Sequence, residues 1–250
     1  MTTAAEMRGR TALVTGASGG IGRAIAEQLG GRGADVVLVG RNEAALEAAA
    51  ATVRTRGGTA RTIALDLADP AAPRKLVDQV GEVELLVNNA GVAPGGPIAE
   101  ADPAALRSML DLNVTALTEL SALLIPAMVA RGHGSVLNVA SVAGYLPAPG
   151  LAGYAASKSY VLALSRALWA ELRGSGVRVV AVSPGATRTA MNPDGTRTAE
   201  QVATTALAAL DGSSPAVIDG GFNAVVGRVF EALPARVGSP LAGWLLARFG

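Results

Sequence analysis

The sequence predicts an α/β fold, a doubly wound parallel sheet of about seven strands with helices on both faces. Short apolar runs rich in Val, Leu and Ile alternate with longer alanine-rich segments of helical periodicity, which is the pattern of βαβ units. Several runs end in glycine-rich or polar turns, as strands do at the ligand-binding edge of such a sheet. With 250 residues, 50% of them hydrophobic and 16% charged, the chain can bury one full core.

The predicted elements follow one another without a repeat or a break in composition. The expected strands cover residues 11–15, 36–39, 61–65, 85–87, 134–140 and 177–182, with 216–218 as a short edge strand. Helices are expected from about 21 to 30, over 42–55, from Pro70 or Pro73, from Asp102 to about Ile125 with a kink or break at Pro126, from about 152 to 173, and over 198–210. One domain, 1–250, is the simplest count, with 10–221 as its core and 222–250 as an amphipathic helical extension.

Composition excludes several classes of function. A net charge of +1 and an aromatic content of 3% leave no basic surface and few stacking residues for nucleic acid. The absence of cysteine removes disulfides, thiolate metal sites and thiol nucleophiles, and fits a reducing compartment. The single histidine, His133, is interpreted as a solvated loop residue, so we expect no metal site and no Ser-His-Asp hydrolase. No signal peptide or uninterrupted membrane-length apolar run is present, and we expect a cytoplasmic protein.

A glycine-rich turn directly follows the first predicted strand. Gly16, Gly20 and Gly22 give the spacing GxxxGxG, and a helix begins within it. A strand, such a turn and a helix N-terminus together form a site for a dinucleotide diphosphate, because backbone N–H groups and the helix dipole favour an anion. Taken alone, the glycines could merely end a strand. Their position between a strand and a helix favours the nucleotide site and a Rossmann-like sheet.

The end of the second predicted strand bears on which cofactor binds. A carboxylate at this place would hydrogen-bond the ribose 2′-hydroxyl of NAD and repel the 2′-phosphate of NADP. This chain has Gly40, Arg41 and Asn42 instead, and an arginine is suited to pair with a phosphate. We therefore predict NADP(H), with NAD(H) less favoured. The alternative is that Arg41 is a solvated residue that opens the next helix.

Tyr154 and Lys158 lie four positions apart, on one face of a predicted helix. The ordinary pKa of a phenol is about 10. A neighbouring ammonium should lower that pKa toward neutrality, where an acid/base group works best. Ser141 ends the preceding predicted strand, at the edge where ligands bind. Singly, each residue has an ordinary structural explanation; together, beside a nucleotide-binding turn, they favour proton transfer in catalysis.

These motifs, in this order, resemble the short-chain dehydrogenase/reductase family over about residues 10–190. The resemblance rests on the TGxxxGIG turn at 15–22, the Asp66-Leu67 pair, the NNAG segment at 88–91, the set Asn113, Ser141, Tyr154 and Lys158, and Pro184-Gly185 with Thr189 beyond it. It implies that Tyr154 exchanges a proton with the substrate oxygen, that Ser141 holds that oxygen, and that Lys158 lowers the tyrosine pKa and binds the nicotinamide ribose. Asn113 would hold a water that links Lys158 to solvent.

The resemblance also implies the cofactor contacts. They are expected at Gly16, Ser18, Gly20, Ile21, Gly22, Arg41, Asn42, Asp66, Leu67, Asn88, Ala90, Gly91, Tyr154, Lys158, Pro184, Gly185, Thr187 and Thr189. NADP-preferring relatives often carry a second basic residue inside the glycine turn, where this chain has Gly19, so the preference for NADP(H) depends on Arg41 alone. The family usually forms homodimers or homotetramers through the helices around 102–125 and 154–173.

Two regions depart from the family pattern. The segment between Gly185 and the next helix is short for a substrate lid, and the chain continues well past Asp219-Gly220-Gly221, where many relatives end. Apolar residues recur at helical spacing in this tail, with arginines among them. We favour packing on its own or a partner's substrate pocket, followed by core or dimer packing, and then by a peripheral membrane contact.

The predicted function is therefore an NADP(H)-dependent oxidoreductase (EC 1.1.1.-) acting on a carbonyl or secondary alcohol. The expected pocket residues are mostly apolar (92–97, 142–151, Met191 and the tail), which favours an uncharged, fairly hydrophobic substrate. Two alternatives stay open: a catalytically silent nucleotide sensor, and a sugar-nucleotide epimerase or dehydratase that shares the Tyr-x-x-x-Lys pair. Sensors usually lose the tyrosine or lysine, and epimerases usually carry a larger substrate domain than the residues after Gly185 provide.

Overall fold

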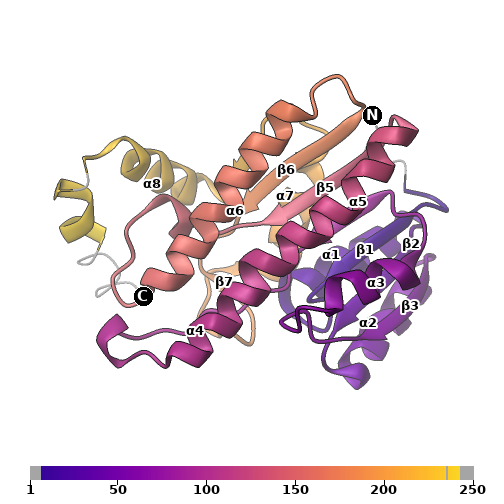
Figure 1. The fold of residues 1–250 in the computed structure, drawn as a ribbon, viewed down its shortest axis with the longest axis horizontal. Coiled ribbons are helices and arrows are strands. Elements are labelled where there is room, and N and C mark those ends of the chain that lie inside the picture. The colour runs from indigo at the N-terminus through magenta and orange to yellow at the C-terminus, as the bar shows by residue number, and fades with distance from the viewer. Residues whose placement is uncertain (1–6, 235, 243–250) are drawn as a thin grey trace.

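The computed structural model describes residues 7–234 and 236–242 (Figure 1). Its centre is a seven-stranded sheet in the order β3-β2-β1-β4-β5-β6-β9, and every neighbouring pair is parallel. The strands are β1 (Thr11–Thr15), β2 (Asp35–Gly40), β3 (Thr59–Ala64), β4 (Leu85–Asn88), β5 (Gly134–Val139), β6 (Val177–Ser183) and β9 (Ala216–Ile218). The predicted fold class and the short edge strand are confirmed.

Alternate residues of each strand enter opposite cores, because side chains on a strand point to opposite faces. In β1, Val14 belongs to one buried cluster and Leu13 to the other, and in β2 Leu38 and Val37 divide in the same way. Register follows this pattern, since Leu13 lies opposite Val37 of β2 and Leu86 of β4. The inner strands β1, β2, β4, β5 and β6 are buried on both faces and are mostly apolar, whereas the edge strands β3 and β9 are partly exposed.

Two groups of helices cover the faces. The cluster on the first face includes residues of α1 (Gly20–Gly30), α2 (Glu43–Thr55) and α7 (Ala199–Ala209). The second face is covered by α3 (Ala72–Val80), α5 (Leu117–Arg131) and α6 (Ala152–Glu171), of which α5 and α6 run side by side across the front of Figure 1. Caps agree with the predicted starts: Asn42 accepts from Ala45 N–H, and Thr198 forms a capping box with Gln201.

The helical run after Asp102 differs from the prediction. Asp102 caps α4 (Pro103–Leu110), a π-helical segment (Asp111–Ala116) follows, and α5 continues through Pro126 to Arg131. The predicted break at Pro126 is therefore wrong; the irregular turn comes earlier, around Asn113. By length and mean hydropathy (1.6), the helical run Pro103–Arg131 could cross a membrane. Several of its apolar residues, however, are buried in the core on the second face of the sheet.

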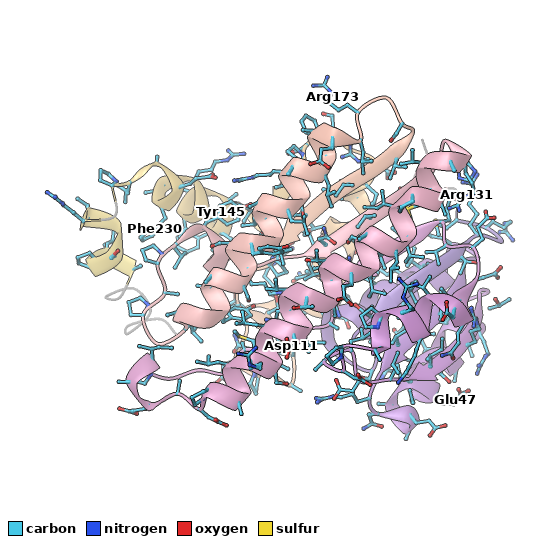
Figure 2. The ribbon with its side chains drawn as sticks, viewed as in Figure 1. Glu47, Asp111, Arg131, Tyr145, Arg173 and Phe230 are labelled. Carbon is cyan, nitrogen blue, oxygen red and sulfur yellow. The ribbon has the colours of Figure 1, made fainter. Side chains whose placement is uncertain are left out.

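The chain after β9 forms α8 (Gly221–Ala232) and a further helical stretch over 236–242. Arg166 of α6 pairs with Glu231 of α8 at 2.9 Å, and a Cβ on Gly227 would lie 3.7 Å from Cγ of Tyr145. Figure 2 shows Tyr145 beside α6 and Phe230 on α8, at the end of the molecule where α6 begins. Part of the predicted tail pattern, residues 243–250, lies outside the described residues.

Candidate active site

The order in which strands are added to the sheet reverses between β1 and β4. Strands β2 and β3 lie on one side of β1, and β4 lies on its other side. In doubly wound sheets, ligands bind beside the carboxyl ends of the strands at such a switch point. Thr15 ties these two strand ends together. Its Oγ1 donates to Val87 O at 3.2 Å and accepts from the N–H groups of Asn89 and Ala90 at 2.9 and 3.0 Å.

The glycine-rich turn packs tightly against the segment after β4. A Cβ on Gly22 would lie 2.3 Å from Asn89 Nδ2, and one on Gly16 would lie 2.7 Å from the same atom. Gly16 and Gly20 also have φ of 66° and 53°, which glycine adopts most readily. Asn89 donates to Thr15 O at 2.9 Å and so fixes the turn. These glycines therefore serve the fold of the turn itself.

The opening of α1 fits a diphosphate. Its N-cap residue is Gly19, no side chain caps the helix, and the first turn carries no acidic residue. A Cβ on Gly19 would meet no atom within 4 Å, so the turn is open at this point. The predicted contacts Gly20, Ile21 and Gly22 form the first turn of this helix, whose N–H groups favour an anion.

The end of β2 places the residues predicted to bind the adenosine half. Arg41 is largely exposed, with Nη1 3.9 Å from Oδ2 of Asp66. Ser18 Oγ lies 3.4 Å from the position of a Cβ on Gly40, so Ser18 and β2 are in contact. Asn42, also predicted to touch the cofactor, uses its side-chain oxygen to cap α2.

Asp66 and Leu67 follow β3 and lie in different environments. Asp66 is exposed, and its Oδ1 accepts from Ala68 N–H at 3.0 Å, which fixes the turn after the strand. Leu67 is buried in the core of the second face. The pair thus offers an exposed carboxylate above an apolar side chain, at the same edge of the sheet as Arg41.

Asn88 and Asn89 have opposite orientations. The side chain of Asn88 is buried and donates to Ser121 Oγ at 3.2 Å and Asn138 Oδ1 at 2.9 Å, within the core. Asn89 instead holds the glycine turn, a role that the sequence analysis did not assign. The alternation of side chains at the end of β4 is the signal that could have separated the two.

Lys158 is buried at the centre of the predicted catalytic set. Nζ donates to Val139 O at 2.8 Å and lies 3.5 Å from the position of a Cβ on Gly91. Nζ is also 5.8 Å from the centre of the Tyr154 ring. Burial lowers the pKa of Lys158 to about 8, because the charged form loses hydration. The ammonium therefore lies between Tyr154 and the segment that follows β4.

The pKa of Tyr154 does not follow the prediction. Burial of the phenol raises its pKa above the ordinary value, and a hydrogen bond with Ser141 partly opposes this effect. The prediction of a lowered pKa for Tyr154 is thus wrong for the protein alone, because loss of hydration outweighs the hydrogen bond with Ser141. Ser141 also accepts from Ala143 N–H at 3.2 Å, so its hydroxyl is fixed at the end of β5 and faces Tyr154.

Asn113 lies in the π-helical segment with its side chain buried. Oδ1 accepts from Val92 N–H at 3.0 Å, while Nδ2 donates to Val92 O at 2.9 Å and to Ser157 Oγ at 3.2 Å. Both amide protons are thus engaged, and the side chain fixes the loop after Gly91 beside Lys158. Ser157, which links Asn113 to α6, was not among the predicted residues.

Pro184 and Gly185 follow β6 next to Ser141. Pro184 O accepts from Val142 N–H at 2.9 Å, which joins this turn to the end of β5. Thr187 is buried and donates to Gly185 O at 3.0 Å. Thr189 reaches the glycine turn, since its Cγ2 is 3.1 Å from the position of a Cβ on Gly20. The predicted residues after β6 therefore lie beside Ser141 at one end and beside the glycine turn at the other.

The predicted residues thus converge on one edge of the sheet. No group of three or more His, Asp or Glu side chains within the described ranges could hold a metal ion. The arrangement offers an anion site at α1, a cation at Arg41, and a hydroxyl pair beside a buried ammonium. Such a set can hold a dinucleotide and exchange one proton with a bound oxygen.

Comparison with known proteins agrees with this geometry. The family model for short chain dehydrogenases matches residues 10–200. A short chain dehydrogenase of Pseudocercospora fijiensis is 36% identical over 187 residues, which are 72% of this chain and 60% of that protein. The ketoacyl reductase HetN of Nostoc sp. is 37% identical over 183 residues, 72% of this chain and 64% of that protein. The chain thus spans less than two thirds of the length of these two relatives.

Solved structures show the same fold with either cofactor. A short-chain dehydrogenase from Sphingobium yanoikuyae in complex with NADPH has a TM-score of 0.80 and 32% identity, covering 90% of this chain and 96% of that one. A short-chain dehydrogenase/reductase from Burkholderia phymatum in complex with NAD has a TM-score of 0.83 and 27% identity, covering 89% and 93%. The chain belongs to the short-chain dehydrogenase/reductase family.

Proposed function

We propose that the protein is an NADP(H)-dependent oxidoreductase that interconverts a carbonyl and a secondary alcohol. The observation that carries this proposal is the convergence of Tyr154, Ser141 and Lys158 beside Gly91, at the strand edge that also presents the uncapped start of α1. A silent nucleotide sensor has no need for a buried ammonium beside a buried phenol. Such groups are costly to bury and occur where chemistry requires them.

The bound cofactor supplies the hydride, and the chain supplies the proton. Tyr154 donates its phenolic proton to the oxygen of a carbonyl during reduction, or accepts the proton of an alcohol during oxidation. Its raised pKa keeps the phenol protonated in the absence of ligands, which suits an acid. Ser141 donates a hydrogen bond to the same oxygen and stabilises the negative charge that develops there.

Lys158 stabilises the phenolate that Tyr154 becomes after it has given up its proton. Below its pKa of about 8 the side chain is a cation, and a cation close to the ring favours the charged form of the phenol. Of its three N–H groups, one is directed at Val139 O. The others are available to ribose hydroxyls next to Gly91, as the family resemblance implies. Asn113 positions this region through Val92 rather than holding a water with its amide N–H groups.

The preference for NADP(H) over NAD(H) depends on Arg41. No carboxylate stands at the end of β2 to repel a 2′-phosphate, and the exposed guanidinium can pair with one. We expect Arg41→Ala to raise the Kd for NADPH about tenfold, since a charge-assisted pair is lost, and to leave that for NADH nearly unchanged. Titration of both cofactors by nicotinamide fluorescence measures this. Equal effects on the two cofactors would contradict the assignment.

The proposed substrate is uncharged and fairly hydrophobic. Met191, Phe222 and Val225 are exposed, on the segment after Gly185 and on α8, and none of them carries a charge. Ketoacyl reductases, among them HetN and the FabG enzyme of Escherichia coli, which is 33% identical over 190 residues, are similar to this chain and act on carbonyl groups, as their names state. A screen of NADPH oxidation against ketones and aldehydes of increasing apolar size identifies the substrate.

We also propose one domain over 1–250, with 10–221 as its core, in a cytoplasmic homodimer or homotetramer. Leu110, Val129 and Tyr160 are exposed on the helical layer around α5 and α6, where the family usually associates, and their exposure supports this assembly. Light scattering of the purified protein tests the oligomeric state. A monomer at micromolar concentration would contradict it.

The decisive test of the proposed chemistry is Tyr154→Phe. This change removes one hydroxyl and keeps the ring, so the fold and cofactor binding should persist. Because the proton donor is lost, we expect kcat to fall by about a hundredfold or more. NADPH binding, measured by fluorescence, should change by less than about twofold. Substantial remaining turnover with an unchanged pH profile would remove Tyr154 from the reaction.

A further inference from the structure

Asp219 carries a fully buried carboxylate directly after β9, at the same edge of the sheet as the candidate active site. Both oxygens are engaged. Arg197 donates from Nε to Oδ2 at 2.8 Å and from Nη2 to Oδ1 at 2.7 Å, and Thr205 donates to Oδ1 at 2.6 Å. A bidentate arginine is the strongest partner that a buried carboxylate can have, and it fixes geometry as well as charge.

Arg197 closes the base of the segment that follows Gly185. It lies in β8 (Arg197–Thr198), which pairs with β7 (Thr187–Arg188), with Thr187 opposite Arg197. Ala186 O accepts from Arg197 N–H at 3.2 Å. Residues 186–197 therefore form a loop with both ends fixed at one place, and the Arg197 side chain ties that place to Asp219.

Thr189, directly after β7, brings this loop into contact with the glycine turn. Thr189 exchanges backbone hydrogen bonds with Asn192 at 3.0 and 3.1 Å, which makes a compact turn. Its methyl carbon lies 3.1 Å from the position of a Cβ on Gly20, at the start of α1. The loop anchored by Arg197 thus lies against the first residue of α1, the helix whose N-terminal N–H groups are proposed to hold the cofactor diphosphate.

The backbone of Asp219 anchors a second element. Asn223, in the first turn of α8, donates from Nδ2 to Asp219 O at 2.8 Å. A Cβ on Gly185 would lie only 2.3 Å from Asn223 Nδ2, so Asn223 packs directly on the turn after β6. Asp219 thereby links three segments: the loop beside the glycine turn, the Pro184-Gly185 turn and the start of α8.

We propose that Asp219 is a positioning residue for cofactor binding, which acts through Arg197 on the loop 186–197 and through Asn223 on Gly185. This inference rests on the proposed function in so far as the ligand is NADPH. These contacts fix the loop 186–197 relative to Gly185. The loop lies beside the proposed diphosphate site, and Gly185 lies beside the proposed nicotinamide site. None of the three linking side chains touches the reacting atoms.

The test combines two measurements on purified full-length protein. Asp219→Asn keeps the shape of the side chain but removes the charge, and Arg197→Lys keeps the charge but removes the bidentate geometry. Thr205→Val is the matched control, because it removes a hydrogen bond to the same carboxylate without touching the loop. Tryptic cleavage after the exposed Arg188, without cofactor, reports loop anchoring, and NADPH fluorescence reports Kd.

We expect Asp219→Asn to raise the rate of cleavage after Arg188 and the Kd for NADPH each by about fivefold. The value of kcat should change less than KM, because the substitution removes a positioning contact and leaves the reacting groups in place. Arg197→Lys should lie between this variant and the wild type. Unchanged cleavage and Kd in either folded variant would overturn the inference, as would equal effects of Thr205→Val. If Asp219→Asn does not fold, Arg197→Lys decides. If the wild type does not bind NADPH, the proposed function is refuted. The rate of cleavage after Arg188 would still test whether Asp219 anchors the loop.

Discussion

Replacement of Lys158 by methionine should stabilise the cofactor-free protein at neutral pH while abolishing its activity. The lysine is buried, and burial lowers its pKa from the ordinary 10.5 to about 8. Methionine has a similar length, no charge and a flexible shape that suits a buried site. The substitution therefore removes a charge that destabilises the folded protein and that the proposed chemistry at Tyr154 requires.

The size of the effect follows from the lowered pKa. Lowering the pKa from 10.5 to about 8 means that protonated Lys158 destabilises the folded state by about 3 kcal/mol at pH 7. Loss of the bond to Val139 O takes back about 1–2 kcal/mol, because that carbonyl loses a donor. We therefore expect the variant to be more stable than the wild type by about 1–2 kcal/mol at pH 7.

The sign of the pH dependence is fixed by where each state releases its proton. Below pH 8 both the folded and the unfolded wild type are protonated, and the penalty is constant. Between pH 8 and 10.5 the folded state has lost the proton and the unfolded state still holds it, so wild-type stability rises with pH. Relative to the variant, the wild type should gain about 2 kcal/mol between pH 7 and 9.5.

Urea unfolding without cofactor at pH 7 and pH 9.5 measures this gap. Lys75→Met is the matched control, since it removes an exposed ammonium, and it should change stability by less than about 0.5 kcal/mol at both pH values. A gap between wild type and Lys158→Met that stays constant over this range would refute the reasoning. It would show that Lys158 keeps its ordinary pKa despite its burial.

Three further substitutions test the packing of the site. Gly22→Ala should destabilise the protein by about 2–4 kcal/mol, because the new Cβ would lie 2.3 Å from Asn89 Nδ2. The control, Gly19→Ala, places a Cβ with no atom within 4 Å and should change stability by less than about 1 kcal/mol. Urea unfolding compares the two variants, and equal losses of stability would contradict the packing argument. Asn113→Ala should cost about 2–3 kcal/mol and lower kcat, since three hydrogen bonds that hold Val92 and its surroundings are lost. Urea unfolding together with steady-state rates checks this, and a stable, fully active variant would show that Asn113 is dispensable.

The elements of the fold that could be predicted are those with a strong local pattern. The inner strands are short, mostly apolar runs, and such runs bounded by turns indicate parallel strands buried on both faces. The N-terminus of α4 followed from Asp102 and Pro103, because a capping side chain and proline favour the first turn. The edge strand Ala216–Ile218 was also expected, since three apolar residues follow a polar turn.

What could not be predicted depends on contacts between distant segments. Alternation along β4 could have separated Asn88 from Asn89, but the buried partners of Asn88, Ser121 and Asn138, lie 33 and 50 residues further along the chain. Similarly, His133 was interpreted as a solvated loop residue, yet its Nδ1 lies 2.8 Å from Oε2 of the buried Glu84, 49 residues earlier. The raised pKa of Tyr154 has the same origin, because the burial of a side chain is set by the whole fold.

One strand supplies two of the groups that surround the Tyr154 hydroxyl. The last residue of β5, Val139, provides the carbonyl that binds Lys158, and Ser141 follows two positions later. Strand β5 is hydrogen-bonded to β4 and β6 on its two sides and is closely packed, so its residues move together. Displacement of β5 therefore moves the carbonyl that accepts from Lys158 and the Ser141 hydroxyl together, because only Ala140 separates the two residues. Tyr154 and Lys158 both belong to α6, so the bond from Lys158 to Val139 O holds the helix that carries the phenol against the strand end that carries Ser141.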